Sequence, residues 1–193
     1  GLASKNGILF KGSNFLDVIT KVNVIVMDKT GTLTKGVFKV QEVVANGIDK
    51  TELVRLTAAL EKKSTHPIAK AVTDYADDKT NGVKAEEVEE ISGHGLKGKV
   101  DGKQVLAGNV KLLRKYNIAY PAEIENIVDT IVVTAINNQY SGYITIADEI
   151  KEDAAQAVKD MHSLNIKTVM LSGDKQSVVN EVAKKVGIDE AFG

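Results

Sequence analysis

Residues 23–34 read NVIVMDKTGTLT, and this stretch decides the fold of the chain. Residues 24–27 are apolar, largely β-branched and without polar alternation, which is typical of a parallel strand buried on both faces. Asp28 follows at the carboxyl end of that strand, where open α/β sheets bind their ligands. The stretch therefore predicts an α/β domain whose functional site lies around the Asp28 carboxylate.

The loop after Asp28 suits a phosphate group. Lys29 supplies positive charge, Gly31 permits a tight turn, and Thr30 and the other threonines of the loop offer hydroxyl and amide donors. A carboxylate in this setting can attack a phosphoryl group and form an aspartyl-phosphate, provided that Mg²⁺ offsets the repulsion between anions. An Asp after a strand often only caps a turn, but the whole DKTGTLT string favours the nucleophile.

The composition excludes several classes of protein. Among 193 residues, 25 Lys and Arg nearly balance 26 Asp and Glu, so no basic field for nucleic acid is present. Cysteine is absent and the three histidines form no close pair, so we predict neither disulfides nor a transition-metal site. No apolar run approaches the ~20 residues of a membrane helix, and no signal peptide is apparent. We therefore expect this stretch of chain to behave as a soluble piece.

Residues 37–141 differ in pattern from the buried strand before them. They begin with apolar–polar alternation, continue with amphipathic helices, and contain a strong hairpin signal at Asp101-Gly102. After residue 142 the strand–helix order of a parallel sheet returns. We interpret residues 37–141 as an α+β insertion, built on an antiparallel sheet, within a discontinuous α/β domain of residues 1–36 and 142–193. The predicted elements are a leader helix at 13–19, a strand at 37–43, helices at 51–62 and 67–77, a hairpin at 97–107, helices at 109–116 and 121–129, strands at 131–136 and 143–146, a helix at 152–163, a strand at 167–171 and a helix at 176–186.

Two further segments place a carboxylate or a hydroxyl at the end of a predicted strand. Ser172, Gly173 and Asp174 follow one strand, and Asp148 follows another. If these strands neighbour the strand before Asp28 in one parallel sheet, all three segments meet at one edge, and the amides after Gly173 form an anion site. Asp148 alone is also a reasonable helix N-cap.

Residues 93–99 match the G-x-G-x-x-G and G-x-x-x-x-G-K patterns of nucleotide-binding loops. Both patterns require a helix directly afterwards, because the helix N-terminus binds the phosphates. A hairpin follows here instead, and Val100 stands where a P-loop has Ser or Thr, so we reject both. We interpret Gly93 and Gly95 as a strand edge where a flat ligand approaches the backbone, with a plain glycine-rich hairpin as the alternative.

Several motifs resemble those of one protein family. DKTGTLT at 28–34 resembles the phosphorylation signature of P-type ATPases, the ion pumps of the haloacid dehalogenase superfamily. EKKSTHP at 61–67 is similar to the E-x-x-S-x-H-P motif of the heavy-metal-transporting pumps. SGD at 172–174 is close to the family's TGD motif, and DEIK at 148–151 to its hinge motif. The resemblance covers essentially the whole chain.

The resemblance implies an architecture and a set of functional residues. Residues 1–36 and 142–193 would form a Rossmann-like, haloacid-dehalogenase-type phosphorylation domain, with 1–21 as a stalk-like leader and 37–141 as a nucleotide-binding domain. Asp28 would attack the γ-phosphate of ATP, and Mg²⁺ would lie at Asp28 and Thr30. The catalytic residues implied are Asp28, Lys29, Thr30, Ser172, Gly173 and Asp174. The nucleotide-binding residues implied are Glu61, His66, Gly93, Gly95, Gly108 and Asn109, with Glu61 accepting from the adenine amino group.

The resemblance also implies parts that lie outside these residues. In the pumps, a membrane domain, an actuator domain and a later G-D-G-x-N-D segment complete the protein, so we expect a cytosolic, incomplete phosphorylation domain at the cytoplasmic face of a membrane, not competent alone. Two rival functions stay open. A soluble haloacid-dehalogenase-type phosphatase generally has a second Asp where this chain has Thr30, which disfavours hydrolysis, and a non-catalytic nucleotide-binding module needs no phosphorylation.

Overall fold

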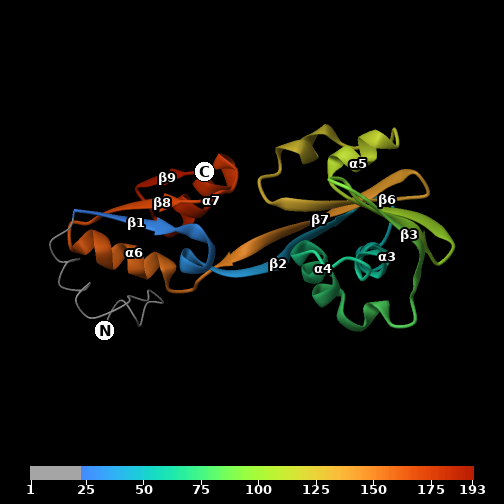
Figure 1. Cartoon of the computed structure of the whole chain (residues 1–193), viewed down its shortest axis with the longest axis horizontal. Coiled ribbons are helices and arrows are strands. Elements are labelled where there is room, and N and C mark those ends of the chain that lie inside the picture. The colour runs from blue at the N-terminus through green and yellow to red at the C-terminus, as the bar shows by residue number, and fades with distance from the viewer. Residues whose placement is uncertain (1–22) are drawn as a thin grey trace. The chain divides into compact units, whose positions relative to one another are not determined.

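The computed structural model describes residues 23–193 (Figure 1). The leader helix expected at 13–19 lies outside the described residues. The chain divides into two compact units, Gly1–Val37 with Asp148–Gly193, and Phe38–Ala147. The second boundary lies later than the expected residue 141, because strand β7 (Gln139–Ile150) continues through that position without a break.

The first unit contains a three-stranded parallel sheet in the order β1-β8-β9 (Figure 1). Its register places Asp28, the last residue of β1, opposite Leu171, the last residue of β8. Helices α6 and α7 pack into one hydrophobic core with Met27 and Met170 of the sheet. The elements of this unit are β1 (Val24–Asp28), the turn η1 (Lys29–Leu33), α6 (Ala154–Ser163), β8 (Lys167–Leu171), α7 (Gln176–Val186) and β9 (Glu190–Phe192).

Strand β1 is not buried on both faces, contrary to the prediction from its apolar sequence. Met27 is only 6% exposed, whereas Val24 is 46% and Val26 is 58% exposed. Side chains alternate between the two faces of a strand, and both α6 and α7 pack on the face that carries Met27. Within residues 23–193, the other face of β1 therefore remains largely uncovered.

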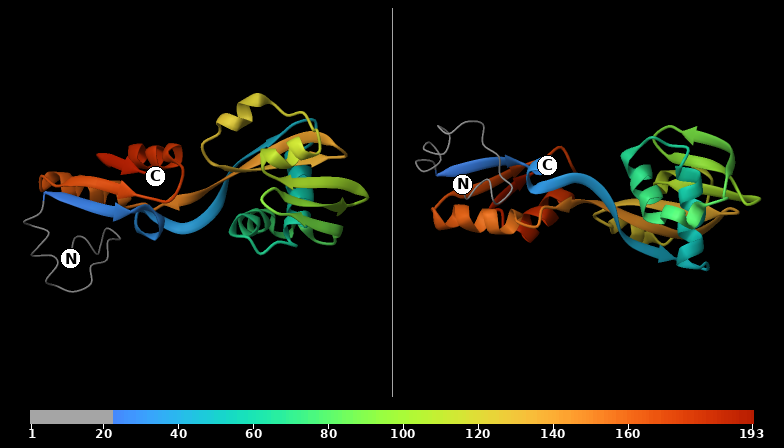
Figure 2. Two further views of the ribbon diagram at one scale, coloured as in Figure 1. Left: turned by 45° about the horizontal axis from the view of Figure 1, so that its top comes forward. Right: turned by 90° about the horizontal axis from the view of Figure 1, so that it is seen from below.

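The second unit is built on a six-stranded sheet in the order β2-β7-β6-β5-β4-β3, in which the neighbours from β3 to β7 pair antiparallel (Figure 2). Helices α3 and α4 share a core with one face of this sheet, and α5 shares a separate core with the other. The strands are β2 (Thr34–Ala45), β3 (Ala85–Ile91), β4 (Gly95–Val100), β5 (Lys103–Gly108), β6 (Thr130–Ile136) and β7; the helices are α3 (Lys50–Glu61), α4 (Pro67–Ala76) and α5 (Val110–Lys115), with short 3₁₀ turns η2 (Asp77–Thr80) and η3 (Ala122–Asn126).

Side chains alternate between the two faces of each strand, so the same strands contribute residues to both cores. On β5, Val105 and Ala107 face the core of α3 and α4, while Leu106 faces the core of α5. Val132 and Val133 of β6 divide in the same way. The predicted α/β class with an antiparallel α+β part is confirmed. Three elements differ from prediction, since residues 121–129 form only the η3 turn and the strands β3 and β9 were not expected.

Candidate functional site

The loop after β1 presents Asp28 to solvent and turns sharply behind it. Asp28 is exposed, and Gly31 has φ 78°, a left-handed conformation that glycine adopts without strain. Thr34 closes the turn, because its hydroxyl oxygen lies 3.2 Å from the carbonyl oxygen of Lys29 and accepts from the amide of Gly31 at 3.3 Å. The local sequence thus produces a compact turn that leaves the Asp28 carboxylate accessible.

Lys29 is held beside this loop by an ion pair. Its Nζ lies 2.7 Å from Oδ2 of Asp174. The Lys29 side chain is nearly buried, whereas Asp174 is about half exposed. Ser172 arranges the partner, because its Oγ accepts a hydrogen bond from the Asp174 amide at 3.1 Å. The structure therefore brings the segment after β8 to the Asp28 loop, as the parallel order of β1 and β8 requires.

One expectation about this edge of the sheet is not met. Asp148 does not end a strand of the parallel sheet, because β7 belongs to the antiparallel sheet. Its carboxylate instead accepts from the Thr34 hydroxyl at 2.6 Å and from the Val37 amide at 3.0 Å. Asp148 therefore joins β7 to the start of β2, directly after the Asp28 loop.

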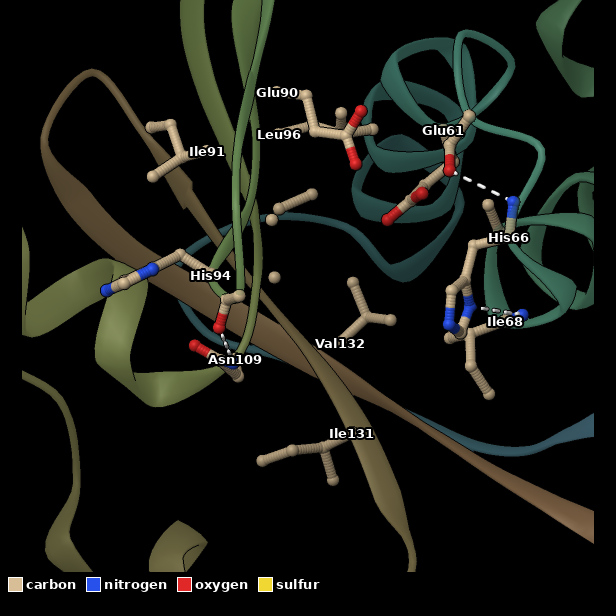
Figure 3. A pocket seen from close by; sticks show the side chains of 16 residues that line it. Glu61, His66, Ile68, Glu90, Ile91, His94, Leu96, Asn109, Ile131 and Val132 are labelled. Carbon is tan, nitrogen blue, oxygen red and sulfur yellow. Dashed lines mark hydrogen bonds between the residues drawn. The ribbon is translucent and has the colours of Figure 1, made fainter.

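The second unit contains a pocket of about 290 Å³ between the helices α3 and α4 and the strands β3 to β6 (Figure 3). Figure 3 shows Glu61 and His66 on one side and His94 and Asn109 on the other, with Val132 between them. The six residues for which the sequence predicts nucleotide binding all line this pocket; they are Glu61, His66, Gly93, Gly95, Gly108 and Asn109. Three separate stretches of sequence therefore meet at one cavity.

Glu61 is a buried acid at the end of α3. Only 7% of the residue is exposed, and no hydrogen bond or ion pair joins its carboxyl to another residue between 23 and 193. Burial alone raises the pKa of Glu61 to about 7, because removal from water disfavours the charged form. The carboxyl thus faces the pocket with its hydrogen-bonding capacity available to a ligand.

His66 has a defined orientation at the start of α4. Its Nδ1 accepts a hydrogen bond from the backbone amide of Ile68 at 3.1 Å, so it acts as the helix N-cap. Because Nδ1 is the acceptor, the proton of the neutral ring lies on Nε2. Ser64 supports the turn by accepting from the His66 amide at 3.2 Å. Pro67 follows at the first helical position, where its missing N–H costs nothing.

The glycines of the pocket have a structural role that differs from the one expected. Strand β4 lies between β3 and β5, so Gly95 is not at a strand edge. Gly95 pairs with Gly108, and a Cβ on either would collide with backbone of the neighbouring segment: the Ala107 carbonyl for Gly95 and the His94 carbonyl for Gly108. These glycines are therefore required by the close approach of two strands. Gly93, with φ 73° and open space around it, serves the turn.

Asn109 fastens that turn to the pocket wall. Its Oδ1 caps α5 by accepting from the Leu112 amide at 3.2 Å, and its Nδ2 donates to the Gly93 carbonyl at 2.9 Å. Sequence reasoning missed several lining residues, among them Glu90, His94 and Val132. His94 is half-buried. Only the alternation of β6 could have placed Val132 on this face.

The fold agrees with comparison to known proteins. A model of the haloacid dehalogenase-like hydrolase family matches residues 22–193, and the chain belongs to this family. A zinc-transporting ATPase of Synechocystis sp. is 46% identical over 191 residues, covering 98% of this chain and 26% of that protein. The chain spans about a quarter of the length of the curated relatives it matches. The predicted resemblance to heavy-metal-transporting P-type ATPases is confirmed by these relatives.

Solved structures point the same way. A crystal structure of a zinc-transporting PIB-type ATPase in the E2.Pi state matches with a TM-score of 0.81 and 30% identity, over 98% of this chain and 32% of that one. The catalytic domain of the CPx-ATPase CopB-B, described for its conformational changes upon nucleotide binding, matches with a TM-score of 0.67 and 29% identity, over 98% and 69%. Within residues 23–193, no helix is long and apolar enough to cross a bilayer.

Proposed function

We propose that this chain is the cytosolic ATP-binding and aspartyl-phosphorylation part of an ATP-driven heavy-metal cation transporter. The observation that carries the proposal is the gathering of Glu61, His66, the glycines and Asn109 around one pocket. A pocket of this size, with apolar walls and a few polar groups, is typical of a small-ligand site. In the parent protein, the partners would be a membrane domain and an actuator domain of the same chain, at the cytoplasmic face of the membrane.

The pocket suits the adenine end of ATP. Leu96 and Val132 supply apolar surface for a flat base, and the buried Glu61 carboxyl accepts from its exocyclic amino group. The Nε2–H of His66 is directed by the N-cap bond of its other nitrogen and donates to the nucleotide. These contacts bind and orient ATP and do not themselves break a bond.

The Asp28 loop would carry the phosphoryl transfer. A carboxylate oxygen of Asp28 attacks the γ-phosphorus in line, an oxygen–phosphorus bond forms, and the bond to the bridging oxygen of ADP breaks. Lys29, oriented by Asp174 at 2.7 Å, offsets negative charge on the transferring group. The hydroxyl of Ser172 lies in the same segment and serves phosphate oxygens. The phosphorylated residue would be Asp28.

Mg²⁺ fits the donors at this loop. Asp28 and Thr30 would hold the ion, since both offer oxygen ligands, which Mg²⁺ prefers. Within residues 23–193, no group of three or more His, Asp or Glu forms a dedicated metal cage. When bound, Mg²⁺ offsets the charge of the phosphates during transfer.

Isothermal titration with Mg-ATP tests the nucleotide site. Replacing Glu61 by Ala is expected to weaken ATP binding by about tenfold or more, because a hydrogen bond from a buried group to the base is lost. Glu89→Ala is the matched control, since Glu89 is exposed on β3 and does not line the pocket. Equal affinities for the two variants would refute the assignment of the pocket.

A further inference from the structure

Building on the proposed nucleotide site, we propose that Glu61 recognises adenine as a neutral carboxylic acid, so that nucleotide binding is coupled to uptake of a proton by Glu61. Sequence motifs do not reveal the protonation state of Glu61. The burial of its side chain, its place at a helix end and the chemistry of the base do.

The surroundings of Glu61 disfavour a negative charge. The residue is 7% exposed and makes no ion pair within the described part of the chain. It is also the last residue of α3, where the partial negative charge of the helix C-terminus opposes a carboxylate. Burial raises the pKa of Glu61 to about 7, in agreement with this geometry.

The titratable groups around the pocket supply no compensating positive charge. Those that line it with Glu61 are His66 before α4, Glu90 of β3 and His94 in the β3–β4 turn. Strands β4, β5 and β6 contribute only uncharged residues to the pocket, and η2 contributes none. No charged group, of either sign, contributes to the shift in the pKa of Glu61. A ligand that enters the pocket therefore meets an acid that takes up a proton readily.

The edge of adenine distinguishes the two forms of the carboxyl. It presents a donor, the exocyclic amino group, beside an acceptor, the ring nitrogen N1. A neutral carboxylic acid offers one acceptor and one O–H donor, whereas a carboxylate offers acceptors only. The neutral form thus makes two hydrogen bonds with adenine, while the carboxylate would set a negative oxygen against N1. In the bound state the proton lies on the Glu61 carboxyl, shared with N1.

The proposal predicts a specific pH dependence. Above the pKa of free Glu61, a proton must be taken up from solvent on binding, so affinity should fall by about tenfold for each pH unit. Glu61→Gln is the informative variant, because its amide carries a donor and an acceptor at every pH. The ratio of the Kd of the wild-type protein to that of Glu61→Gln should therefore rise as pH increases, while contributions common to the two proteins cancel in the ratio.

Adenosine is the probe that isolates the base, since it has no phosphate that titrates near neutral pH. Calorimetric titrations of the wild-type chain in two buffers of different ionisation enthalpy should show proton uptake that approaches one proton per adenosine as pH rises above 7. This measurement needs no variant and holds if Glu61→Gln fails to fold. Binding without proton uptake, or a Kd ratio that does not change with pH, would overturn the inference and leave the nucleotide site standing. Absence of both ATP and adenosine binding would instead refute the proposed function.

Discussion

Replacing Glu61 by Gln should raise the stability of the unliganded protein in a pH-dependent way. Folding raises the pKa of Glu61 from 4.5 to about 7 by burial. Because each pKa unit corresponds to about 1.4 kcal/mol, ionising this carboxyl in the folded state costs about 3 kcal/mol. The side chain is only 7% exposed, so solvent screening reduces this cost little.

The sign follows from the two pKa values. Below pH 4.5 the carboxyl is protonated in both the folded and the unfolded state, and the cost is absent. As pH rises from there to about 7, the unfolded chain ionises first and is favoured, so the free energy of unfolding falls. Above about pH 7 the full cost is present. Glutamine stays neutral at every pH, so the free energy of unfolding of the variant does not include this cost.

Urea unfolding followed by circular dichroism, at about pH 5 and about pH 8, measures the effect. The stability gain of Glu61→Gln over the wild type should be larger by about 2–3 kcal/mol at the higher pH. Hydrogen exchange of the α3 amides assigns the change to the second unit. Glu89→Gln, at an exposed site, should follow the wild type at both pH values. A gain for Glu61→Gln that is equal at both pH values would refute the reasoning, and with it the neutral acid in the pocket.

Two further substitutions test the Asp28 loop and the glycine pair. Asp174→Asn should destabilise the first unit by about 2 kcal/mol in urea unfolding, which is less than the loss from a fully buried pair because Asp174 is half exposed. Adding Lys29→Met should recover part of this loss, and no recovery would show that the ion pair is not its cause. Gly95→Ala should lower the free energy of unfolding by about 3 kcal/mol or more through collision with backbone, whereas Gly93→Ala should lower it by about 1 kcal/mol through its positive φ alone. Equal shifts of the thermal midpoint for the two variants would contradict the close approach of β4 and β5.

Strong local signals made much of the fold predictable. The helices α3, α4 and α7 follow their apolar periodicity, and α7 ends at Gly187, which has a left-handed conformation. The hairpin of β4 and β5 turns at Asp101-Gly102 as its sequence indicates. Strand β3 was not predicted because its sequence, AEEVEEI, has few apolar residues. It lies at the edge of the sheet, where charged side chains face water and little periodicity is needed.

The candidate site was predictable as a set of residues but not as a geometry. Motif spacing indicated Glu61 and His66, and the structure places them on one pocket. No sequence pattern could show that Asp148 contacts Thr34, because this contact depends on the length of β7. Nor could the apolar run before Asp28 show that one face of β1 is open, since burial depends on which elements pack against it.

The energetics of Glu61 give a physical reason for a lone acid in the pocket. Burying an ionisable group without a partner normally destabilises a protein, and the cost here grows as the pH rises from 4.5 to about 7 and stays constant above that. An apolar residue at the same position would avoid that cost but could neither accept from nor donate to a base. The carboxyl recovers its hydrogen bonds only when a ligand brings both a donor and an acceptor. The instability of the empty pocket thus favours the bound state, and it favours ligands whose edge matches a neutral acid.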